Sequence, residues 1–165
     1  TEAAVLAAID YQGPVYIRLG RAETKDIHDD SYHFEWGKAE VLRQGSDVSI
    51  FATGIMTAKA LDAAETLAKQ GIQAEVINVH TIKPLDEETV IASAKKTGKV
   101  VTAEEHSIIG GLGSAVAEVL ARQCPTKQAF VGVQDSFGES GSPDDLLEKY
   151  GLTAEAIVKA AVGLQ

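Results

Sequence analysis

The chain has 165 residues, of which 45% are hydrophobic, so it can bury a sizeable core as one domain or as one domain with part of another. Its formal net charge of −9 argues against nucleic acid or an anionic membrane as a partner. No apolar run is long enough to span a bilayer, and the single Cys124 cannot form an internal disulfide, so we expect a cytoplasmic protein.

The first part of the chain contains a helical pattern over residues 3–9 and an apolar, strand-like run at 15–17. Because the helical pattern starts without a capping signal and Thr1 is not methionine, we expect the parent protein to contain sequence upstream. Residues 22–36 are rich in acidic side chains and show neither the helical nor the strand periodicity of apolar residues, which is typical of a connector. Phe34 and Trp36 are expected to fix this connector to the domain that follows.

Strand-like and helical patterns alternate after the connector. The strand-like runs lie at 39–42, 48–51, 74–77, 100–102 and 129–131, and the helical faces at 58–68, 90–94, 116–120 and 157–161. Such alternation predicts an α/β fold with a largely parallel sheet and helices on both of its faces. The connection at Gln44-Gly45 is too short for a crossover, so the two strands that it joins are predicted to pair antiparallel.

Turn and capping residues agree with these helices. Gly71, Gly98 and Gly151 follow predicted helix ends, where a left-handed residue is needed. Asp86 is placed to cap the helix after it, and Ser142 followed by proline and two aspartates is typical of a helix start.

Three glycines follow a strand-like run and precede a helix, in the segment 104–114. Gly111 and Gly113 fit the first two positions of a dinucleotide-binding G-x-G-x-x-G motif, but Val116 occupies the third. Two interpretations of Gly111 and Gly113 remain open. Their backbone amides could bind an anion at the helix start, or the missing side chains could allow close packing on the sheet or on another subunit.

Charged and imidazole side chains supply the other candidate sites. Glu104, Glu105 and His106 have acid–base chemistry, but consecutive residues of an extended chain point to opposite sides, so an interface or structural role is favoured. Arg18 and Arg21 end the first strand-like run and could bind phosphate or be ion-paired. The histidines and acids of the connector fit no metal-ligand spacing, so no metal site is expected.

Taken together, the motifs resemble those of the thiamine-diphosphate-dependent transketolase family over nearly the whole chain. Residues 13–21 resemble the end of the family's pyrimidine-binding domain. Six further segments resemble its C-terminal domain, namely 37–43, 52–54, 82–86, 104–106, 110–116 and 137–152. The resemblance implies a pyrimidine-domain tail at 1–21, a connector at 22–36 and a transketolase C-terminal domain at 37–165. It also implies a three-layer α/β/α fold whose mostly parallel five-stranded sheet has one antiparallel strand.

The same resemblance implies a transferase that moves two-carbon ketol units between sugar phosphates, as in the pentose phosphate pathway, with thiamine diphosphate and Mg²⁺. Arg21 matches an arginine that contacts the substrate phosphate, and Arg18 is a weaker candidate. The chain contains no Gly-Asp dipeptide for the family's metal-binding loop, and the glutamate that activates the cofactor lies upstream in the family. We therefore expect this chain to have a structural role and to form a dimer or another homo-oligomer. We expect it to contain no catalytic residue, to bind no cofactor and to be inactive without the N-terminal portion or subunit.

Two alternatives stay open. The chain could be a stand-alone anion- or nucleotide-binding module built on Glu105, His106, Gly111 and Gly113. It could also be the equivalent domain of deoxyxylulose-phosphate synthase or of a 2-oxo acid dehydrogenase β subunit, although the ending at 137–152 favours transketolase by resemblance.

Overall fold

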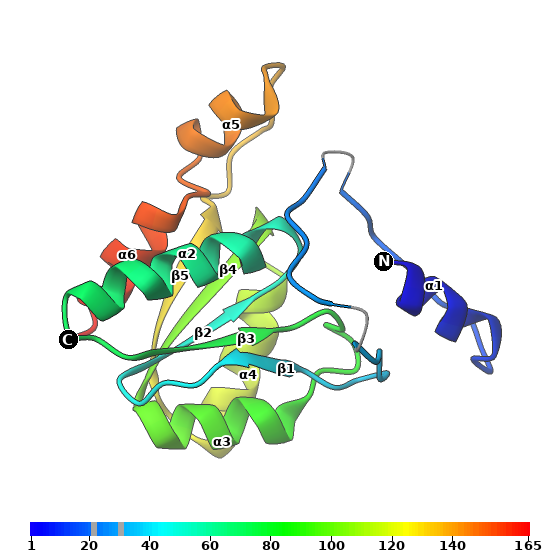
Figure 1. The fold of residues 1–165 in the computed structure, drawn as a ribbon, viewed down its shortest axis with the longest axis horizontal. Helices are drawn as coiled ribbons and strands as arrows, with labels where there is room; N and C mark the ends of the chain where they lie inside the picture. Colours follow the sequence, from blue (N-terminus) through cyan, green and yellow to red (C-terminus); the bar gives the residue numbers. More distant parts are fainter. Residues whose placement is uncertain (21–22, 30–31) are drawn as a thin grey trace.

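The computed structural model describes residues 1–20, 23–29 and 32–165, and its centre is a five-stranded sheet (Figure 1). The strands are β1 (Glu40–Arg43), β2 (Val48–Ala52), β3 (Ala74–Asn78), β4 (Lys99–Ser107) and β5 (Lys127–Val133). The helices are α1 (Glu2–Ile9), α2 (Ile55–Lys69), α3 (Glu87–Thr97), α4 (Leu112–Gln123), α5 (Pro143–Lys149) and α6 (Ala154–Val162).

Alternate strand residues build two separate cores on the two faces of the sheet. Ile50 packs with α2 and α6 on one face, whereas its neighbour Phe51 packs with α3 and α4 on the other. Both side chains are fully buried, as expected for a sheet that helices cover on both sides. The three-layer α/β/α prediction is therefore confirmed.

The antiparallel strand is present, but its partner differs from the prediction. The sheet order is β1-β3-β2-β4-β5, in which β2 to β5 are parallel and β1 pairs antiparallel with β3. The prediction that the strands joined at Gln44-Gly45 pair with each other is therefore wrong. Four residues can span roughly 13 Å, which exceeds the about 9.5 Å between strands that flank a third one, so the short connection can cross β3.

Backbone contacts show how this connection crosses the start of β3. The amides of Ser46 and Asp47 donate to the Gln73 carbonyl at 3.0 and 2.9 Å, and the Gln73 amide donates to Asp47 Oδ2 at 2.6 Å. A Cβ atom on Gly45 would lie 2.2 Å from the backbone carbon of Ala74. Glycine is therefore required here by the close approach of two backbone segments.

The predicted turn and capping residues have their expected roles. Gly71, Gly98 and Gly151 have φ angles of 81°, 68° and 67°, which places them in the left-handed region after their helices. Asp86 Oδ1 accepts from the Thr89 amide at the start of α3, and Ser142 accepts from the Asp145 amide at the start of α5. The predicted helix at 3–9 is also confirmed as α1, none of whose residues is buried.

The strand predicted at 15–17 is not formed within the described part of the chain. Residues 15–17 are not paired with another strand that the structure describes. A β-strand needs a neighbouring strand to form hydrogen bonds with its backbone amides and carbonyls. Phe34 fixes the connector to the domain as predicted, through its contact with the His80 ring, whereas the described ring contacts of Trp36 are with Phe34 and with Tyr11 before the connector. Within the described ranges, no helix is both long and apolar enough to cross a membrane.

We expect Gly45→Ala to destabilise the protein by about 1–3 kcal/mol, because the added methyl group must displace the backbone of β3. Gly138→Ala is the matched control, since a Cβ there would meet nothing within 4 Å. Urea unfolding followed by circular dichroism measures both changes. Equal stability of the two variants would contradict the crossing described above.

Candidate functional site at the carboxyl edge of the sheet

The predicted site residues that the structure describes lie where the parallel strands end. At this edge Arg18 Nη2 donates a hydrogen bond of 3.1 Å to the backbone carbonyl of Glu105, near the end of β4. The structure therefore brings Arg18 and Glu105 together across 87 positions of sequence. Arg21 lies outside the described residues. Ligands of open α/β sheets bind at this edge, so its chemistry decides what the domain can do.

Glu104 is the polar centre of this edge. Its side chain is 2% exposed, and its two oxygens accept from the amides of Leu112 and Gly113 at 2.7 and 2.8 Å. These amides belong to the first turn of α4, where hydrogen-bond donors lack partners within the helix and the helix dipole favours a negative charge. The carboxylate of β4 thus caps the helix that follows it.

The glycines at this helix start are needed for close packing. A Cβ on Gly111 would lie 2.0 Å from Glu104 Oε2, and one on Gly113 would lie 2.6 Å from Cδ1 of Phe130 on β5. The structure thus supports the packing interpretation of both glycines. The anion-binding interpretation would require an external anion to displace the Glu104 carboxylate from the amides of Leu112 and Gly113.

Glu105 and His106 are not arranged with Glu104 as one acid–base group, although His106 lies within ion-pair distance of Glu104. Both are exposed while Glu104 is buried, so Glu105 turns away from its neighbour as strand geometry requires. His106 Nδ1 lies 2.8 Å from the Ser107 carbonyl and 4.0 Å from Glu104 Oε2. The capping role of Glu104 was not predicted from the sequence. The available signal was an acidic residue at the end of an apolar strand, shortly before a glycine-rich helix start.

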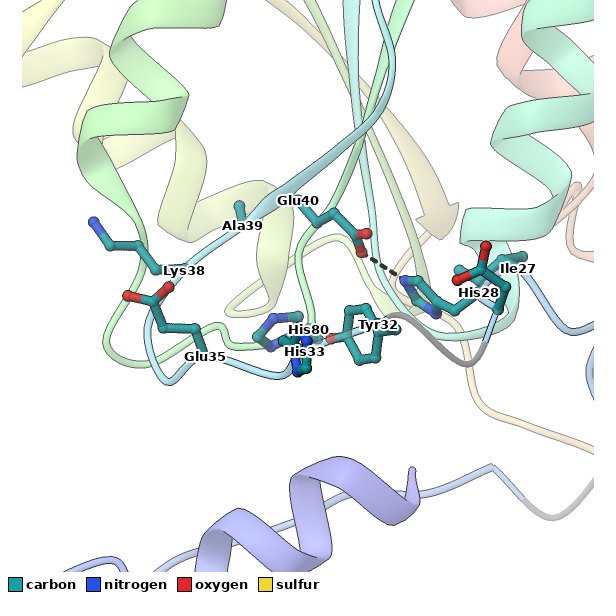
Figure 2. A pocket seen from close by; sticks show the side chains of 10 residues that line it. Ile27, His28, Tyr32, His33, Glu35, Lys38, Ala39, Glu40 and His80 are labelled. Atoms are coloured by element: carbon teal, nitrogen blue, oxygen red, sulfur yellow. Dashed lines mark hydrogen bonds and ion pairs between the residues drawn. The ribbon is translucent and has the colours of Figure 1, made fainter.

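A cavity of about 490 Å³ lies between the connector and the edge of the sheet, lined among others by His28, Tyr32, His33, Glu40 and His80. Figure 2 shows His28 directed at the carboxylate of Glu40, whose Oε2 is 2.6 Å from His28 Nε2. The Tyr32 ring lies on the His28 ring with centroids 3.9 Å apart. The sequence alone does not indicate a role for Tyr32, Glu40 or His80, because these residues come close to one another only in the folded chain.

The cavity shifts two ionisation equilibria. Burial, together with the negative charge of Glu40, raises the pKa of Tyr32 above its usual value. Burial lowers the pKa of His80, and the nearby His28 lowers it further, although Glu40 acts in the opposite direction. His80 is therefore held as a neutral imidazole at neutral pH, with Nδ1 2.8 Å from Thr81 Oγ1 and its ring 4.6 Å from that of Phe34.

The described residues do not fit a metal-bound diphosphate cofactor. In that part of the chain, no three His, Cys, Asp or Glu side chains are grouped so that they could hold a metal ion. The amides of Leu112 and Gly113, the donors at the glycine-rich helix start, are occupied by Glu104.

The fold and its edge define an open α/β domain of the kind that meets ligands or neighbouring domains at its strand ends. The family model described as "Transketolase, C-terminal domain" matches residues 37–157, and the chain belongs to this family.

Curated relatives give the same assignment. The chain is 60% identical, over 92% of its length, to the 6-deoxy-6-sulfo-D-fructose transketolase subunit SqwH of Clostridium sp. strain MSTE9, of which the match covers 47%. It is 44% identical over 96% of its length to a putative transketolase C-terminal section of Methanocaldococcus jannaschii, covering 50% of that protein. The chain thus spans about half the length of these two relatives.

A solved structure supports the fold at high similarity. It is a split-gene transketolase described as an inactive beta4 tetramer, with a TM-score of 0.95 and 53% sequence identity. The match covers 98% of the present chain and 53% of the solved one. The chain also matches a 1-deoxy-D-xylulose-5-phosphate synthase of Desulforudis audaxviator with 40% identity, over 25% of that enzyme.

Replacing Glu104 by glutamine is expected to destabilise the protein by about 1–3 kcal/mol, because one helix amide then faces an NH₂ group and the capping charge is lost. Glu105→Gln changes the exposed neighbouring acid and serves as the control. Urea unfolding at pH 7 compares the two variants. A cost for Glu105→Gln as large as that for Glu104→Gln would contradict the capping role.

We expect the contact between Phe34 and His80 to weaken on acidification. Because the pKa of His80 is lowered in the folded state, its contribution to stability is present above the ordinary histidine pKa of about 6.5 and is lost as the pH falls through the folded pKa. Trp36 is the single tryptophan and contacts Phe34, so its fluorescence reports this contact. The wild type should show a transition with a midpoint below 6.5 that His80→Gln lacks and His33→Gln retains. An identical fluorescence profile in His80→Gln and the wild type would contradict this assignment.

Proposed function

We propose that this chain is the C-terminal portion of a transketolase subunit. The 60% identity to a transketolase subunit over 92% of the chain is the observation that carries the proposal. In this proposal residues 1–21 end the pyrimidine-binding domain, residues 22–36 connect the domains, and residues 37–165 are the C-terminal domain. The family match starting at residue 37 supports the last of these boundaries.

The intact enzyme transfers two-carbon ketol units between sugar phosphates with thiamine diphosphate and Mg²⁺, a cytoplasmic reaction of the pentose phosphate pathway type. In this proposal the cofactor binds to the N-terminal portion or subunit, because residues that fit it are lacking in the described part of this chain. The C-terminal domain serves structure and assembly as part of a dimer or larger homo-oligomer. The exposed Leu6 and Ile9 of α1, at 57% and 73% exposure, support a contact with another part of the enzyme.

Arg21, with Arg18 as second candidate, contacts the anionic group of the sugar substrate in this proposal. A guanidinium group has several N–H donors in a planar fork that matches phosphate oxygens. Arg18 is held at the carboxyl edge by its hydrogen bond to the Glu105 carbonyl, which supports a site for the substrate at this edge. The sulfosugar named for the Clostridium relative suggests that sulfonate substrates should be tested beside phosphates.

Deoxyxylulose-phosphate synthase is the second candidate, favoured by a 40% identical relative. This enzyme and the 2-oxo acid dehydrogenase β subunits share the domain architecture that the resemblance implies. The deoxyxylulose-phosphate synthase reaction and the transketolase reaction give different products, so one set of product assays distinguishes the two candidates.

The test combines the complete subunit containing this chain with its N-terminal partner, thiamine diphosphate and Mg²⁺. We expect ketol transfer from a ketose phosphate or from 6-deoxy-6-sulfo-D-fructose in the complete assembly and none from this chain alone. Arg21→Ala should lower kcat/KM by about 10- to 100-fold through the loss of a charge-assisted contact, and Arg18→Ala by less. Arg122→Ala, on the last turn of α4, is the control. A folded, cofactor-loaded assembly without ketol transfer would refute the proposal, and formation of deoxyxylulose phosphate would favour the second candidate.

A further inference from the structure

We propose that a connector anchor, made of His28, Tyr32 and Phe34 on the connector and Glu40 and His80 on the domain, positions Arg18 for the anionic end of the substrate. The proposal rests on the function proposed above. His28 and Glu40 are then positioning residues, which act on the substrate through the arginine and do not touch it themselves.

The anchor joins the connector to two different strands of the sheet. Glu40 is the first residue of β1, and His80 follows the end of the neighbouring β3, so both lie at the carboxyl edge. His28 binds the carboxylate of Glu40 at 2.6 Å, and Phe34 lies on the ring of His80 at 4.6 Å. His28 and Phe34 of the connector are therefore each held to the domain, and Figure 2 shows the contact of His28 with Glu40.

The contact between His28 and Glu40 has features of a persistent interaction. The two side chains are 23% and 34% exposed, so solvent screens the contact only in part. A neutral imidazole with its proton on Nε2 donates to the carboxylate, and a protonated imidazole adds an ion pair, so the contact exists in both states. The Tyr32 ring, 3.9 Å from the His28 ring, limits the rotation of His28.

A second connector contact, outside the anchor, is weaker in comparison. Lys25 lies 3.7 Å from Asp62 on α2, and these side chains are 71% and 55% exposed. Exposed ion pairs of this kind contribute about 0–1 kcal/mol. The anchor therefore contributes more to the docking of the connector than this ion pair does.

Arg18 is linked to this docking through the chain, since it lies ten positions before His28. Its hydrogen bond to the Glu105 carbonyl is exposed and is made by a long, flexible side chain. Without the anchor, only this hydrogen bond and the contact of Tyr11 with Trp36 are left, of the interactions described, to hold the segment that carries Arg18 at the edge. Misplacement of a substrate-binding group by about 1 Å can change catalytic efficiency by about 100-fold, so the anchor can affect binding without contacting the substrate.

A purely structural role makes a different prediction from a positioning role. If the anchor positions the arginine, its loss raises KM for ketose donors that carry a phosphate and leaves KM unchanged for a donor without the phosphate. General damage to the fold would affect both donors equally and would lower kcat. The comparison of the two donors therefore separates the two roles.

The experiment uses the complete, cofactor-loaded enzyme with His28→Ala or Glu40→Gln in the subunit that contains this chain. We expect faster backbone hydrogen exchange at residues 23–29 and 32–36 and a KM for the phosphorylated donor on the order of tenfold higher, with kcat retained. His33→Ala, which changes another histidine lining the same cavity, and Glu88→Gln, which changes an 89% exposed acid of α3, are the matched controls. Both controls should leave exchange and KM unchanged.

Four outcomes would contradict the proposal in whole or in part. Unchanged hydrogen exchange in both anchor variants would refute the anchor itself. Faster exchange with an unchanged KM, or an equal rise of KM for both donors, would refute the positioning role. Absence of ketol transfer in the wild type would refute the proposed function and with it the positioning role, while the exchange data would still decide whether the anchor holds the connector.

Discussion

The carboxyl edge of the sheet depends on one buried charge, the carboxylate of Glu104. Its two oxygens accept from the first amides of α4, and this contact fixes the strand, the glycine-rich turn and the helix relative to one another. Glycine at position 111 leaves the space that the carboxylate occupies. A negative charge at a helix start is stabilised by the helix dipole and by the hydrogen bonds that it accepts, which offsets the cost of its burial. The edge is consequently rigid where β4 meets α4.

The connector is attached to the same edge by different chemistry. The contacts of the anchor are the His28 imidazole with the Glu40 carboxylate and the Phe34 ring with the His80 ring, and all of these residues are half-buried. The two cores, by contrast, consist of buried and mainly aliphatic side chains on both faces of the sheet. Attachment through partly hydrated polar and aromatic groups is weaker than attachment through a core, and a titratable His80 makes it sensitive to acid.

The sequence carried enough information for the layers, the helix caps and the parallel strands, because these depend on local periods and on single capping residues. The partner of β1 could not be predicted, since the short turn at Gln44-Gly45 fixes only the direction of the strand and not its neighbour. Glu104 was missed because its capping oxygens come from the preceding strand, eight residues before Leu112, and not from the usual position next to the helix. The contact of His28 with Glu40 joins two polar residues that no periodicity links, and only the folded chain brings them together.

The edge position of β1 has a consequence for how the domain opens. This strand pairs with β3 alone, through a ladder whose register shifts between Val41 and Arg43, whereas the four parallel strands remain paired without it. Strands at an edge with an irregular ladder separate at a smaller free energy than central strands. Since Glu40 belongs to β1 and contacts His28 of the connector, separation of this strand from β3 would loosen one of the two attachments of the connector, while the contact of Phe34 with His80 lies beyond the end of β3.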